Sequence, residues 1–141
     1  MPKTFEKNFI SHCNNQDLEV NPNQIIVIKK LEQYYQINFK SFFSKLFSKQ
    51  NSKKGFYLFG GVGVGKTMIL NFFIDQIDQK KLRQHFNEFM LSFHDFAHER
   101  KGKNEENVIN QFVKNLKLKA SLIYFDEFQV TNIVDAMILG K

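Results

Sequence analysis

The chain has 141 residues, enough for one domain of ordinary size and not for two. Hydrophobic residues make up 43% and charged residues 24%, a balance that excludes a disordered chain and a fibrous repeat. No apolar stretch reaches the ~18 residues that a membrane-spanning helix needs. The first 20 residues hold no signal-peptide core, so a cytoplasmic protein is expected.

The net charge is +6, from 20 basic and 14 acidic residues. Such an excess can indicate a nucleic acid or an anionic membrane surface as partner. Only Arg83 and Arg100 are arginine, however, and the abundant Lys, Asn, Ile and Phe all have codons rich in A and T. We therefore interpret the basicity as coding bias and expect no nucleic-acid partner. A basic nucleic-acid or membrane module is the alternative.

Residues 1–54 are predicted to form a helical N-terminal segment. Residues 24–35 carry apolar side chains at helical spacing. Residues 40–54 mix Phe and Leu with five lysines, which is typical of an amphipathic stretch in peripheral contact with a membrane. The alternative for this stretch is a helix packed on the core with its lysines in solvent.

Glycines mark the next element, because five of the seven lie within the eleven residues 55–65. Residues 56–59, Phe-Tyr-Leu-Phe, precede most of them and predict a buried strand. Residues 68–79 follow with apolar side chains that predict a largely buried helix. The predicted order is strand, glycine loop, helix.

Strands and helices continue to alternate after this point. Residues 82–86 predict a strand, 88–100 a helix, the apolar positions of 108–116 another helix, and 122–125 a buried strand that ends in Asp-Glu. Alternation of this kind predicts an α/β fold with a parallel sheet.

Residues 60–67 match the phosphate-binding loop motif G-x-x-x-x-G-K-[ST]. Successive backbone N–H groups of such a loop form an anion nest, and the following helix adds its positive N-terminal end. Lys66 can reach the β- and γ-phosphates, and the Thr67 hydroxyl can bind Mg²⁺. The predicted phosphate-binding residues are Gly60, Gly61, Val62, Gly63, Val64, Gly65, Lys66 and Thr67.

Asp126 and Glu127 end the last predicted strand, at the edge where open α/β sheets bind ligands. Asp126 is predicted to hold Mg²⁺ through water, and Glu127 to polarise a water for attack on the γ-phosphate. The sequence has no D-x-x-G at this position, no N-K-x-D motif and only two arginines. ATP hydrolysis, with catalytic Glu127 and Lys66, is therefore favoured over a GTPase or a small-molecule kinase.

His94 and His98 are four residues apart on one predicted helix face, a spacing that can bind a metal. No glutamate follows the first histidine and no third ligand is evident. We interpret the two as packed or solvent-facing histidines.

Three stretches resemble the ZapE-type ATPases, an AAA+-like family with bacterial cell-division and mitochondrial branches. They are residues 55–68, residues 85–91 with the two histidines, and residues 125–139. The Phe-Gln-Val-Thr run after Glu127 is the most specific part. The resemblance covers roughly residues 18–141. Asn87 and Asn132 depart from it, because the family tends to have His and Asp there.

The resemblance implies ATP binding and hydrolysis, with Mg²⁺, used to remodel a protein partner. That partner is the division protein FtsZ in the bacterial branch, and the mitochondrial branch is linked to protein quality control. A complete domain would form a homo-oligomer. The alternative is a nucleotide-binding or protein-interaction fragment without turnover.

Residues 55–141 are expected to form only part of a P-loop ATPase domain. The resemblance implies a further strand between the 56–59 strand and the Asp126 strand, then a helical lid and an arginine inserted by a neighbouring subunit. All of these come later in the family's sequence than Lys141. Arg83 and Arg100 lie too early to match that arginine. The chain alone is thus expected to be a poor ATPase that aggregates or dimerises.

Overall fold

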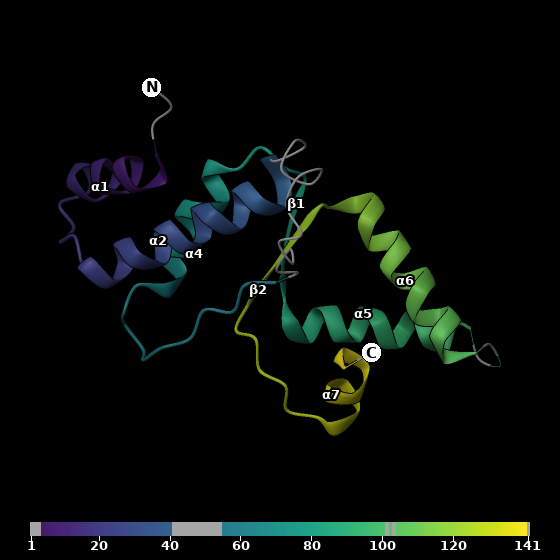
Figure 1. The fold of residues 1–141 in the computed structure, drawn as a ribbon. Coiled ribbons are helices and arrows are strands. Elements are labelled where there is room, and N and C mark those ends of the chain that lie inside the picture. Colours follow the sequence, from purple (N-terminus) through teal and green to yellow (C-terminus); the bar gives the residue numbers. More distant parts are fainter. Residues whose placement is uncertain (1–3, 41–54, 101, 103, 141) are drawn as a thin grey trace. The chain divides into compact units, whose positions relative to one another are not determined.

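The computed structural model describes residues 4–40, 55–100, 102 and 104–140 (Figure 1). The chain divides into two compact units, Met1–Asp78 and Gln79–Lys141, each of which is described by itself. Residues 41–54, which make up nearly all of the predicted amphipathic stretch, lie outside the described residues. The predicted boundary between residues 54 and 55 stays a prediction. None of the described helices combines the length and the apolar character needed to cross a membrane.

The first unit is helical (Figure 1). Its elements are α1 (Phe5–Asn15), α2 (Pro22–Tyr35), the π-helix η1 (Gln36–Lys40) and α4 (Lys66–Gln76). The predicted helix over 24–35 is confirmed as α2, which starts at Pro22 after the cap residue Asn21. The predicted helix over 68–79 corresponds to α4. Helix α1 lies within the predicted helical segment 1–54, although its bounds were not predicted; its buried residues Phe5, Phe9 and Cys13 recur every fourth position.

An aromatic core joins α1, α2 and α4. The ring centroids of Phe9 and Phe72 lie 5.0 Å apart, and those of Phe5 and Phe73 lie 6.1 Å apart. Asn8 Nδ2 donates a hydrogen bond of 2.7 Å to Gln76 Oε1, which ties α1 to the end of α4. These contacts fix α4, and with it the loop that leads into it. The buried side chains of this unit are Phe5, Phe9, Cys13, Ile28, Leu31, Tyr35, Ile69, Phe72, Phe73 and Ile77.

The second unit alternates strands and helices, as predicted. Its elements are β1 (Lys81–His85), α5 (Phe86–His98), α6 (Glu105–Lys119), β2 (Leu122–Asp126) and α7 (Ile133–Leu139). The two strands pair in parallel, with Lys81 opposite Leu122 and His85 opposite Asp126. The prediction of a parallel sheet is therefore confirmed for this pair, although the described chain is mostly helical.

Packing of α5 against α6 forms the core of this unit. Phe86, Met90 and Phe93 face Phe112, and the rings of Phe93 and Phe112 lie 5.2 Å apart. The ring of Phe125 on β2 lies 4.9 Å from Phe89, which seats the strand on α5. Aromatic side chains of α5 therefore support the end of β2.

The prediction of a buried strand at 56–59 is wrong. These residues have no regular secondary structure, and Tyr57 and Phe59 are 67% and 79% exposed. A strand forms only where a neighbour pairs its N–H and C=O groups. No strand in the described part of the chain pairs with 56–59, so the predicted three strands are reduced to two.

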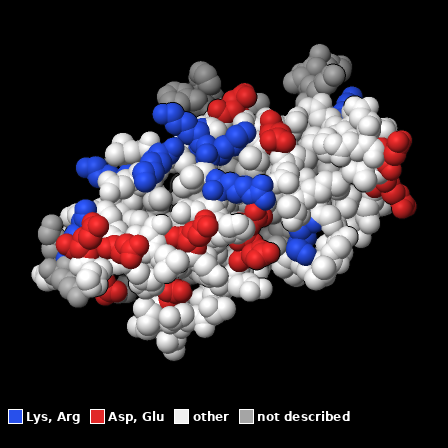
Figure 2. All heavy atoms as spheres, turned by 180° about the vertical axis from the view of Figure 1, so that it is seen from behind, with Lys and Arg blue, Asp and Glu red and all other residues white. Residues whose placement is uncertain are grey.

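Acidic and basic side chains share the face that is drawn in Figure 2.

Candidate functional site

Residues 60–67, called the phosphate loop below, form a turn that runs directly into α4. Gly63 and Gly65 both have φ of +81°, in the left-handed region that favours glycine. Gly65 precedes the first residue of α4, so the last residues of the loop lie at the helix N-terminus. The free N–H groups of that first turn are suited to an anion.

Lys66 folds back over the phosphate loop. Its Nζ donates hydrogen bonds of 2.6 Å to the carbonyl oxygen of Gly61 and 3.0 Å to that of Gly60. The ammonium group thus lies against the loop, on a partly exposed side chain. Backbone donors at a helix start together with one ammonium group fit a triphosphate.

Gln24 of α2 contacts the phosphate loop directly, a contact that sequence analysis missed. Its Nε2 donates a hydrogen bond of 3.1 Å to the carbonyl oxygen of Val64. The Oε1 of Gln24 is buried and has no hydrogen-bond partner among the described residues. A Cβ atom at Gly65 would lie only 2.6 Å from Gln24 Nε2. A side chain at residue 65 would therefore force Gln24 to move from its present position.

In the second unit, Asp126 lies at the carboxyl end of β2, as predicted. Tyr124 donates a hydrogen bond of 2.7 Å from its hydroxyl to Asp126 Oδ1. Arg83 of β1 donates to Asp126 Oδ2 through both Nε, at 2.7 Å, and Nη2. The parallel register sets Arg83 opposite Tyr124, and the guanidinium lies 5.4 Å from the centre of that ring. These three residues are called the Asp126 cluster.

Two pKa shifts follow from this geometry. Burial alone would raise the pKa of Asp126, but hydrogen bonds from Tyr124 and Arg83 and the charge of Arg83 outweigh burial and lower it. Burial, followed by the hydrogen bond to Asp126, raises the pKa of Tyr124 to about 12. At neutral pH the carboxylate is therefore anionic and the phenol remains a donor. An anionic carboxylate is a ligand that suits Mg²⁺.

Glu127 has a φ of +52°, which is uncommon for a residue other than glycine. Strained conformations of this kind cost about 1–3 kcal/mol and cluster at functional sites. The side chain is exposed, and its carboxylate makes no hydrogen bond or ion pair with the described residues. The chain therefore turns sharply after Asp126 and presents a carboxylate to solvent.

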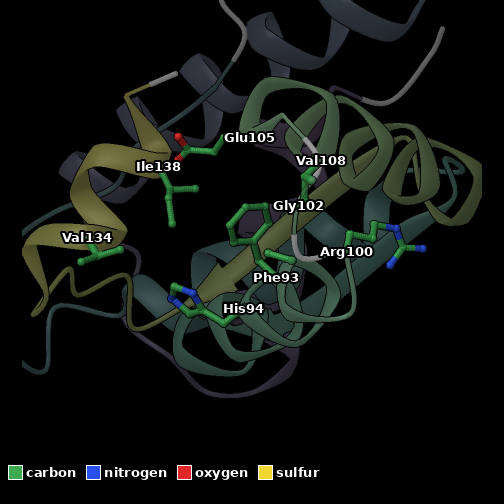
Figure 3. Close-up of a pocket in the computed structure, with 9 residues that line it drawn as sticks. Phe93, His94, Arg100, Gly102, Glu105, Val108, Val134 and Ile138 are labelled. Carbon is green, nitrogen blue, oxygen red and sulfur yellow. The ribbon is translucent and has the colours of Figure 1, made fainter.

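His94, one of the two histidines considered above as metal ligands, contacts an aspartate. His94 Nε2 lies 2.8 Å from Asp135 Oδ1, which links α5 to α7. Among the described residues, no group of three or more His, Cys, Asp or Glu side chains could hold a metal ion. His94 also lines a pocket of about 250 Å³ in this unit, in which Phe93 of α5 and Ile138 of α7 point toward one another (Figure 3). None of the predicted site residues lines it.

A glycine loop that enters a Lys-Thr helix start, in a chain with an aspartate at the end of a parallel strand, is typical of P-loop nucleotide-binding proteins. The phosphate loop lies in the first unit and the Asp126 cluster in the second. The AFG1-like ATPase family matches residues 6–141, and the chain belongs to that family. The predicted resemblance to ZapE-type ATPases is thereby confirmed.

Two relatives show how much of the family's length this chain covers. Lactation elevated protein 1 homolog B of Danio rerio is 37% identical over an alignment of 104 residues; the match covers 67% of this chain and 21% of that protein. Cell division protein ZapE of Escherichia coli K12 is 35% identical over 96 residues, 66% of this chain and 24% of that protein. The chain thus spans about a fifth to a quarter of these relatives. No solved structure matches it.

Substitution of Gly65 by alanine is expected to disturb the phosphate loop. The positive φ is strained for alanine, and the new Cβ displaces Gln24 from Val64. We predict a loss of about 1–2 kcal/mol in the free energy of unfolding, measured in urea, together with weaker MgATP binding. Gly55→Ala is the control, since a Cβ there meets nothing within 4 Å. Equal stability of the two variants would contradict the strain at Gly65.

Proposed function

We propose that this chain binds the phosphates of MgATP through the phosphate loop. The observation that carries the proposal is the place of Lys66, whose ammonium group lies against the carbonyl oxygens of Gly60 and Gly61 at the N-terminus of α4. A γ- or β-phosphate entering the loop would offer the ammonium group an anionic acceptor in place of two neutral carbonyls. The ammonium–phosphate contact pairs two opposite charges, whereas each ammonium–carbonyl bond involves only one charge, so the exchange is favourable.

We assign the other roles from the motifs and the family. Thr67 and Asp126 would hold Mg²⁺, which when bound neutralises charge on the phosphates. Glu127 would orient a water molecule and take its proton, and the strained backbone at Glu127 supports a functional role. ATP hydrolysis to ADP and phosphate is the resulting activity.

A second candidate function is nucleotide binding without turnover. Two observations favour it: residues 56–59 pair with no described strand, and Arg83 already engages the predicted metal ligand Asp126. Sequence analysis likewise expects low turnover for this chain. Nucleotide binding and ATP hydrolysis therefore need separate measurements.

The partner is proposed from the relatives. The Escherichia coli relative is a cell division protein, and the ZapE-type resemblance implies FtsZ as its substrate. We therefore propose a protein substrate of the FtsZ kind, remodelled by a homo-oligomer in the cytoplasm. Contact with a membrane surface would fall to the lysine-rich residues 40–54.

Lys66→Ala should weaken MgATP binding by about 30- to 1000-fold, because loss of a charged contact to phosphate costs on the order of 2–4 kcal/mol. Isothermal calorimetry on both proteins measures this directly. Lys30→Ala is the matched control, since Lys30 is an exposed lysine of α2. Equal affinity of Lys66→Ala and Lys30→Ala would refute the phosphate-loop assignment.

Glu127→Gln should retain MgATP binding and abolish phosphate release, because the amide cannot take a proton from water. Calorimetry and a phosphate-release assay on the same preparation separate the two effects. Glu19→Gln, at an exposed glutamate, serves as the control and should change neither. Loss of binding in Glu127→Gln would show that Glu127 is not simply the base. Undetectable release by the unmodified chain would favour binding without turnover.

A further inference from the structure

We propose that Arg83 is a positioning residue for Asp126, the proposed metal ligand. Arg83 holds Asp126 Oδ2, and a divalent cation, or a water molecule bound to it, must compete with Arg83 for that oxygen. Arg83 thereby sets how strongly nucleotide binding depends on metal. This inference rests on the proposed function, in which Asp126 is a metal ligand.

Both carboxylate oxygens of Asp126 already accept hydrogen bonds. Oδ1 accepts from the Tyr124 hydroxyl, and Oδ2 accepts from two nitrogens of Arg83. Only 16% of the Asp126 side chain is exposed. A cation that approaches Asp126 therefore meets a carboxylate that is already occupied on both sides.

The two side chains that donate to Asp126, Tyr124 and Arg83, differ in how freely they can move. Tyr124 is 7% exposed and lies two residues from Asp126 on the same strand face, so its hydroxyl is fixed. The Arg83 side chain is 55% exposed and sits on a long flexible stem. Arg83 can swing into solvent without leaving a cavity, whereas Tyr124 cannot. The exchangeable oxygen is therefore Oδ2.

The charges of Arg83 and of a cation decide how the two interact at Asp126. Arg83 and a divalent cation both carry positive charge, so they repel each other when they share one carboxylate. Arg83 cannot lose its own charge at any ordinary pH. The guanidinium and the cation therefore compete for Asp126 rather than assist each other.

A merely structural role is the rival explanation. The pair joins the ends of β1 and β2, where His85 lies opposite Asp126. If it only fastened the strands, removal of Arg83 would lower stability and leave the metal dependence of nucleotide binding unchanged. The two explanations thus predict different results for one ratio.

That ratio is the ATP affinity in excess Mg²⁺ divided by the ATP affinity in EDTA, both from calorimetry on the 141-residue chain. We expect Arg83→Gln to raise it about 1.5- to fivefold, the range typical of an exposed ion pair that no longer competes. Arg83→Lys keeps the charge but not the two-nitrogen contact, and should give a smaller rise. It also serves if Arg83→Gln fails to fold. Arg100→Gln is the matched control, since Arg100 bonds Phe96 and Glu99 instead, and should leave the ratio unchanged.

Asp126→Asn separates the inference from the proposed function. If Asp126 binds the cation, this variant lowers the ratio, and adding Arg83→Gln to it changes nothing further. A ratio that Arg83→Gln lowers or leaves unchanged, while Asp126→Asn lowers it, overturns the inference and keeps the metal role of Asp126. A ratio that Asp126→Asn leaves unchanged overturns both.

Discussion

Lys66 holds its ammonium group against the carbonyl oxygens of Gly60 and Gly61, and the chemistry of the phosphate loop depends on where this one charge sits. Helix α4, which carries Lys66, begins directly after Gly65, because the left-handed conformation of Gly65 ends the loop there. The same helix buries Phe72 against α1, so the aromatic core orients the loop. Aromatic packing, the start of α4 and the Lys66 side chain thus together form the loop that we propose binds phosphate.

The Asp126 cluster shows how a parallel strand pair tunes a carboxylate. The register places Arg83 beside Tyr124, and alternation along β2 places Tyr124 beside Asp126. The resulting hydrogen bonds keep the carboxylate anionic even though burial opposes the charge. The same hydrogen bonds would compete with a cation for Asp126. Binding of Mg²⁺ to Asp126 would therefore be weaker than the sequence motif alone suggests. A strained residue, Glu127, follows at once and sends the chain away from the strand.

Sequence patterns predicted most of the elements because apolar spacing and glycine placement are local signals. The helices α2 and α4 and both strands follow from such signals. The bounds of α1 within the predicted helical segment 1–54 were not predicted, since its buried residues Phe5, Phe9 and Cys13 stand among polar neighbours. The strand at 56–59 was wrong because strand formation needs a partner, and composition alone does not supply one. The contact of Arg83 with Asp126 was missed because it depends on the register between β1 and β2, which cannot be read from one strand. The contact of Gln24 with Val64 joins residues 40 positions apart and has no local signal.

The central claim is that backbone N–H groups and the ammonium group of residues 60–67 bind nucleotide phosphates. A ¹⁵N-labelled sample titrated with MgADP and MgATP tests this claim directly, because an amide that donates to a phosphate oxygen moves strongly downfield. We expect Gly63, Gly65 and Lys66 to show the largest amide shifts, and the residues lining the pocket of α5, α6 and α7 to change little. Shifts confined to that pocket, or absent from residues 60–67 at saturating nucleotide, would contradict it.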